Sequence, residues 1–245
     1  MFRAFAGAIF VLACVAVPSA RAADGYRLLT IDGRPVKWGT PQFDTGVVLS
    51  YAILTGRESV SGVRNCTRTV GVEPLLKRSR LDARSFGSAL RDALAMWEGA
   101  ANVKFHRAAD AAAADIVVGT EAVSNGLAYA DVTTVPGEIG PTDRITRGIV
   151  CLSAEPIWTT RVCGSSVRRQ SRGRRDEHCV SYALAHEIGH VLGLDHPGPT
   201  GELMSFAESS VSTLQRGDLL GIAALYGAKR GQPLLALSSR GTASR

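Results

Sequence analysis

Three histidines and a glutamate lie within one short segment near the C-terminal end of the chain. Residues 186–196 read HEIGHVLGLDH and contain His186, Glu187, His190 and His196. On a helix, residues four apart lie on one face, so the imidazoles of His186 and His190 can reach a single ion. Three nitrogen ligands leave the fourth position of a tetrahedral zinc open for water, which is typical of a catalytic site.

Glu187 and Gly193 complete the chemistry of this segment. In an H-E-x-x-H helix the glutamate acts as general base toward zinc-activated water and passes the proton to the leaving group. Gly193 has no Cβ and can adopt a positive φ, so it can end the helix and return the chain to deliver His196. H-E-x-x-H alone matches many chains by chance, whereas the longer motif is far more restrictive.

The elements expected around the motif alternate between strands and helices. Helices are expected over residues 84–99, 179–192 and 213–226, with Asp82 as an N-cap and Gly227 as a C-cap. Strands are expected over residues 47–54, 103–106, 115–119, 127–133 and 148–152, and residues 55–80 are expected to form a long connection. This order indicates a mixed sheet with helices packed on it.

HEIGHVLGLDH resembles the metzincin signature. Leu203-Met204-Ser205 follows His196 at the short distance seen in matrixins, the matrix-metalloproteinase family, and residues 218–227 also look matrixin-like. The resemblance is strongest over residues 179–227 and weaker over residues 38–152. It implies an α+β, metzincin-like fold, with a twisted mixed five-stranded sheet, an active-site helix and a C-terminal helix.

The same resemblance implies a function and further site residues. Met204 would form an apolar floor beneath the zinc ligands, and Phe206 would be a wall of the pocket beside the scissile bond. Leu127, Ala128 and Tyr129 would form an edge strand that pairs with an extended peptide, although a plain edge strand accounts for them equally well. The implied function is a zinc-dependent endopeptidase acting on protein or peptide substrates. The alternative is a catalytically weak, zinc-dependent binding protein of the same fold.

Several positions depart from the matrixin pattern. Pro197 stands where animal matrixins usually carry Ser, and Phe206 stands where astacins and serralysins place a zinc-binding Tyr. No cysteine-switch propeptide is recognisable. Calcium (Ca²⁺) binding stays open, because three acids lie in the loop where matrixins bind it without a recognisable ligand pattern, and surface acids are the other interpretation: Asp131, Glu138 and Asp143.

Four cysteines follow the N-terminal segment, and an even count in an exported chain suggests two disulfides. Three connectivities are open, and we favour Cys163–Cys179, which brackets one loop, together with Cys66–Cys151. A zinc site built from thiolates is the alternative, but the spacing contains no C-x-x-C pair.

The first residues are typical of a signal peptide. Arg3 precedes an apolar run, and cleavage is expected after Ala22, which predicts a secreted or periplasmic protein; a lipoprotein attached at Cys14 is the alternative. Residues 1–22 are thus the signal peptide, 23–45 an extended lead-in, 46–228 the metalloprotease catalytic domain and 229–245 a flexible tail.

Charge and hydropathy narrow the expected partners. Removing Arg3 and Arg21 lowers the net charge from +6 to +4, which is only mildly basic, and no later stretch is long and apolar enough to cross a membrane. Residues 161–175 are rich in arginine and read as a solvated loop, with recognition of acidic substrates or self-cleavage as alternatives. This loop lacks interleaved aromatic residues, so no nucleic-acid partner is expected, and the protein is expected to be a monomer.

Overall fold

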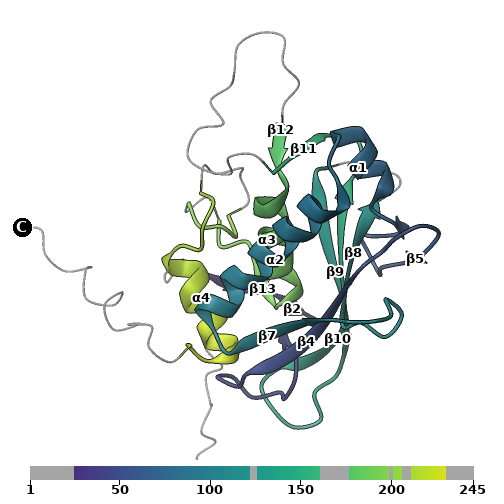
Figure 1. The fold of residues 1–245 in the computed structure, drawn as a ribbon. Coiled ribbons are helices and arrows are strands. Elements are labelled where there is room, and N and C mark those ends of the chain that lie inside the picture. Colours follow the sequence, from purple (N-terminus) through teal and green to yellow (C-terminus); the bar gives the residue numbers. More distant parts are fainter. Residues whose placement is uncertain (1–24, 122–125, 161–176, 199–200, 206–210, 230–245) are drawn as a thin grey trace, which may run out of the picture.

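The structure is a computed structural model that describes residues 25–121, 126–160, 177–198, 201–205 and 211–229 (Figure 1). Its helices are α1 (Glu73–Ser79), α2 (Ala83–Ala100), α3 (Val180–Val191) and α4 (Arg216–Tyr226). Its strands are β1 (Arg27–Leu28), β2 (Thr30–Ile31), β3 (Arg34–Lys37), β4 (Val47–Ile53), β5 (Ser59–Val60), β6 (Thr69–Val70), β7 (Val103–Arg107), β8 (Ile116–Glu121), β9 (Ala128–Val135), β10 (Asp143–Ser153), β11 (Ile157–Thr159), β12 (Glu177–Cys179) and β13 (Leu194–Asp195).

Five strands form the centre of the sheet in the order β7–β4–β8–β10–β9. The first four are parallel to their neighbours, and β9 runs antiparallel to β10 at the edge. The hydrogen-bonded sheet grows to nine strands because β3 joins β10, β2 joins β3, and the β5–β6 hairpin joins β8. The expected α+β class and its mixed sheet are therefore confirmed, with short strands added around the five.

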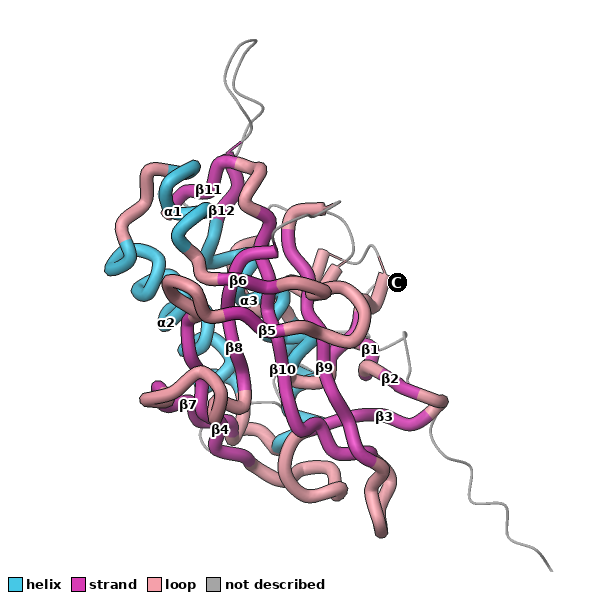
Figure 2. Tube along the Cα trace, turned by 90° about the vertical axis from the view of Figure 1, so that its right-hand side faces the viewer, coloured by secondary structure: helices cyan, strands magenta, loops and turns pink. Residues whose placement is uncertain are grey.

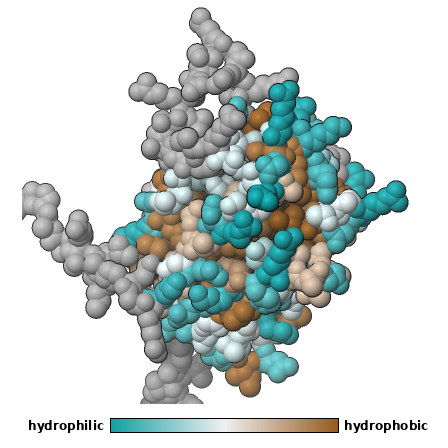
Figure 3. Space-filling model, viewed as in Figure 1, coloured by the Kyte–Doolittle hydropathy of each residue, from teal (hydrophilic) through white to brown (hydrophobic). Residues whose placement is uncertain are grey.

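Helices α2 and α3 pack together over one face of the sheet, and Figure 2 shows the strands in front of them after a quarter turn. Helix α2 begins where expected, because the Asp82 carboxylate accepts a hydrogen bond from the Ser85 N–H at 2.8 Å. Its apolar residues recur at helical spacing and are buried: Phe86, Leu90, Leu94 and Trp97. Figure 3 shows that the surface in the first view mixes hydrophilic and hydrophobic side chains.

Several segments differ from the sequence expectation. Residues 55–80, expected as a connection, contain the β5–β6 hairpin and helix α1, whose seven residues are too few to show a helical period. Helix α4 begins at Arg216 rather than at residue 213, because Gln215 and Asp218 form a capping box. Residues 25–45, expected as an extended lead-in, contain three short strands with turns and bends between and after them, and their strand β3 belongs to the sheet.

A second, smaller group of buried residues lies on the other face of the sheet. It surrounds the disulfide between Cys66 and Cys151, which ties the connection between β5 and β6 to the C-terminal part of β10. This is one of the two pairs favoured from the sequence. Within the described ranges, no helix has the length and apolar character needed to cross a membrane.

Candidate metal centre

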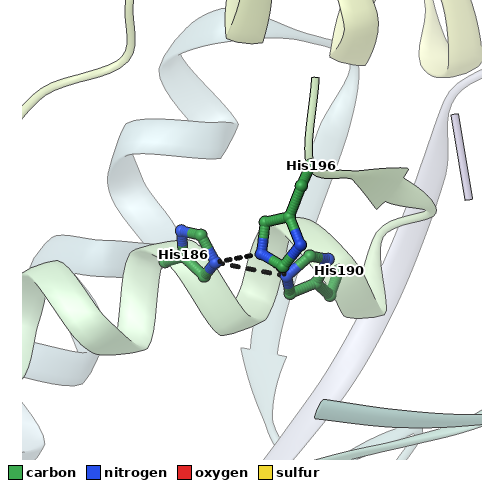
Figure 4. Close-up of side chains that lie close together, drawn as sticks. All are labelled: His186, His190 and His196. Atoms are coloured by element: carbon green, nitrogen blue, oxygen red, sulfur yellow. Dashed lines mark hydrogen bonds between the residues drawn. The ribbon is translucent and has the colours of Figure 1, made fainter. Parts of the chain in front are cut away.

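Helix α3 and the turn after it bring the three histidines together. His186 and His190 lie one turn apart on α3, and His196 follows strand β13 (Figure 4). Gly193 makes the return, with φ of 100°, and a Cβ there would clash with the carbonyl oxygen of Val36. Only glycine satisfies both conditions, so the turn inferred from the sequence has a steric cause.

Strand β1 supports the segment that carries the third histidine. It pairs antiparallel with β13, with Leu28 opposite Leu194. The Arg27 guanidinium lies 3.1 Å from a carboxylate oxygen of Asp195, and the other oxygen of Asp195 accepts the His196 N–H at 2.8 Å. The backbone before His196 is therefore fixed by its pairing with β1 and by the contacts of the Asp195 carboxylate.

The three imidazoles form a nearly equilateral triangle of nitrogen atoms. The Nε2 atoms of His186 and His190 are 3.2 Å apart, and each lies 3.1 Å from Nε2 of His196. Zinc–nitrogen bonds of about 2.05 Å in a tetrahedral site require nitrogen atoms about 3.3 Å apart. Among the residues that the structure describes, this is the one group of three or more possible ligands close enough to share an ion.

Backbone carbonyl groups orient two of these rings. Nδ1 of His186 donates to the Leu203 carbonyl at 2.7 Å, and Nδ1 of His190 donates to the Leu194 carbonyl at 2.9 Å. With the proton on Nδ1, each Nε2 presents a lone pair to the centre of the triangle. Lone pairs that face one another repel, so a cation between them fits this arrangement.

Burial keeps these rings neutral. It lowers the pKa of His186 to about 4 and that of His190 to about 3, and it also lowers the pKa of His196. Neutral imidazole is the form that binds a metal ion, so the ligands need lose no proton at neutral pH.

Glu187 follows His186 on helix α3 and is buried. Its side chain is only 7% exposed, and burial raises its pKa to about 8. A nearby cation favours the ionised form and lowers such a pKa. A metal ion held by the neighbouring histidines would therefore oppose the effect of burial on Glu187.

A loop from Leu203 to Ser205 lies beneath helix α3. Met204 is buried, and a Cβ on Gly189 of α3 would clash with its sulfur atom. The Asp218 carboxylate accepts hydrogen bonds from the backbone N–H groups of Leu203 at 2.7 Å and Met204 at 3.0 Å. No role was expected for Asp218 from the sequence, because residue 218 lies beyond the first turn of the helix expected from residue 213.

The other residues expected at the site, or in the second disulfide, lie in or beside strand β9, at the start of α3, or outside the described residues. Leu127, Ala128 and Tyr129 are half-buried at the start of edge strand β9. Cys179 is disulfide-bonded, while its expected partner Cys163 and the pocket residue Phe206 lie outside the described residues, as do the arginine-rich segment and the expected signal peptide.

Two of the acids considered for calcium already accept hydrogen bonds from the protein. Oδ2 of Asp131 accepts three backbone N–H bonds, and Oδ1 of Asp143 accepts from Arg34 at 2.7 Å and from the Gly137 N–H at 3.0 Å. Both carboxylates therefore have hydrogen-bond donors within the protein.

Comparison with known proteins agrees with this geometry. The family model for matrixin matches residues 73–227, which is more than half of the chain. The chain therefore belongs to the matrixin family, a family of zinc metallopeptidases. No curated protein matches the chain. The resemblance inferred from the motif is confirmed, and the matched region begins at α1, well before the motif.

Proposed function

We propose that the protein is a zinc-dependent endopeptidase. In this proposal His186, His190 and His196 hold one catalytic zinc ion, and Glu187 is the general base. The observation that carries the proposal is the triangle formed by the three Nε2 atoms. In the rings of His186 and His190, Nδ1 donates its proton to a backbone carbonyl group, which leaves Nε2 unprotonated. Membership of the matrixin family supports the same assignment.

The residues divide the reaction between them. A bound zinc supplies a Lewis acid that activates water and polarises the substrate carbonyl. Glu187 takes a proton from the attacking water as the new C–O bond forms, and it delivers that proton to the amine nitrogen as the C–N bond breaks. Met204 packs beneath helix α3, and Asp218 keeps its loop in place. The edge of β9 offers backbone groups to an extended peptide.

Zinc content and proteolysis, measured on the same preparations, test the proposal. We expect about one zinc per chain in wild type and in Glu187→Gln, and we expect the variant to cleave an unfolded protein about 10²- to 10⁴-fold more slowly. Glu177→Gln is the matched control, because Glu177 is an exposed glutamate in the same part of the chain. Equal turnover by wild type and Glu187→Gln would exclude Glu187 as the base. Zinc without cleavage in wild type would favour the alternative, a zinc-dependent binding protein.

We also propose that the protein is exported and that its catalytic unit includes the lead-in. The disulfides at Cys66 and Cys179 support an oxidising compartment. The pairing of β3 with β10 and of β1 with β13 supports a catalytic domain that begins before residue 46. Mass spectrometry of the secreted protein tests both points, with a mature N-terminus at Ala23 as the expected result.

A further inference from the structure

The outer edge of β9 has a defined pattern of backbone groups. The N–H group of Ser153, a residue of β10, donates to the Leu127 carbonyl at 2.7 Å. Two residues further along, Tyr129 lies opposite Cys151 of β10. In an antiparallel pair, alternate residues direct both N–H and C=O toward the partner strand. Leu127 and Tyr129 therefore direct their backbone groups toward β10. Ala128 and Ala130 direct theirs to the outer side, where a peptide would pair.

The chain already occupies one of these two positions. The side-chain amide of Asn65 donates from Nδ2 to the carbonyl oxygen of Ala130 at 3.1 Å. Asn65 lies in the connection between β5 and β6, far from β9 in sequence, and its side chain is exposed. It takes the acceptor that a strand added beside β9 would use at Ala130.

The backbone that presents Asn65 is firmly attached to the sheet. Oδ2 of Asp131, a residue of β9, accepts the N–H groups of Arg64 at 3.0 Å, Asn65 at 2.7 Å and Cys66 at 2.9 Å. Cys66 is also joined by its disulfide to Cys151 of β10. The segment is thus fixed to both strands by contacts that do not involve the Asn65 side chain.

We propose that Asn65 is a specificity-determining residue that ends main-chain pairing along β9 before Ala130. This inference rests on the proposed function, because the peptide concerned is its substrate. In an antiparallel arrangement, the peptide residue opposite Ala130 lies two positions N-terminal to the residue opposite Ala128. The enzyme therefore recognises few main-chain groups on the N-terminal side of its substrate, and it accepts substrates that are not extended there.

Binding of peptide hydroxamates to the zinc-loaded protein tests this inference without turnover. The probes are acetylated alanine peptides of increasing length that end in a hydroxamate, whose oxygen atoms bind zinc and leave the peptide on its N-terminal side. For wild type and the control Ser61→Ala, an exposed position in the same connection, we expect affinity to stop rising once the peptide reaches Ala128. In Asn65→Ala, the added residue should tighten binding about three- to tenfold, the effect of one hydrogen bond.

Two further arms identify the cause. Asn65→Asp keeps the size of the side chain but lacks the amide donor, and it should give the same gain as Asn65→Ala. Methylating the peptide nitrogen opposite Ala130 should abolish the gain in both variants. The same length dependence in all four proteins, or no binding at any length, overturns the inference. If wild type cleaves no protein while the Asn65 effect is present, the proposed function fails and the inference on the edge stands.

Discussion

Replacing the buried pair Cys66 and Cys151 by alanine is expected to lower the free energy of unfolding substantially. The disulfide joins residues 85 positions apart in the sequence. In the chain-entropy model, a loop of this length lowers the entropy of the unfolded chain by about 15 cal/mol/K, or about 4.5 kcal/mol at 25 °C. A stability of roughly 5–15 kcal/mol is usual for a domain, so much of it would be lost.

Urea unfolding of the double variant and wild type, at one fixed zinc concentration, measures the effect. The midpoint should fall, and the slope with denaturant should rise, because the unbridged chain exposes more surface when unfolded. Reducing wild type is a poorer experiment, since it would also cleave the disulfide of Cys179. A loss below about 1 kcal/mol would refute the loop-entropy reasoning and would indicate that the Asp131 contacts hold the segment without the bridge.

Three other changes have defined outcomes. His190→Ala removes one of three ligands, so zinc measured by plasma mass spectrometry should fall from about one per chain to a small fraction; a full complement would exclude His190 as a ligand. Asp218→Asn weakens the carboxylate that holds the Met204 loop, and urea unfolding should show a loss of about 1–3 kcal/mol; unchanged stability would contradict that role. Burial lowers the pKa of Lys37 from 10.5 to about 8. Between pH 8 and 10.5 the unfolded chain therefore binds more protons than the folded protein, so the free energy of unfolding rises with pH in this range. Lys37→Met should remove this rise, seen as the difference between two pH series of urea titrations; parallel series would contradict it.

The parts of the fold predicted from the sequence depend on neighbours along the chain. Helix α2 was predicted because its apolar residues repeat at helical spacing and Asp82 caps its first turn. The histidine triad was predicted because all of its members lie within one helix and one turn. In both cases local geometry brings the residues together, whatever the rest of the chain does.

What was missed depends on contacts between distant segments. Helix α1 has one fully buried residue, Leu75, and too few turns to display a period. Asp131 and Asn65 act on segments about 65 residues away, so neither role leaves a pattern in the sequence. Asp218 reaches back to Met204 in the same way. Side chains of these types are usually solvated, and only the folded arrangement separates these three from the rest.

The pairing of β1 with β13 has a consequence for the order in which the chain folds. Leu28 lies opposite Leu194, so the first described strand pairs with the last and the partners are 166 positions apart. A chain made from its N-terminus has to hold β1 without a partner until residue 194 has been synthesised, and contacts this distant form slowly. Since the third histidine follows β13 directly, the three imidazoles can come together only after this late segment has been made.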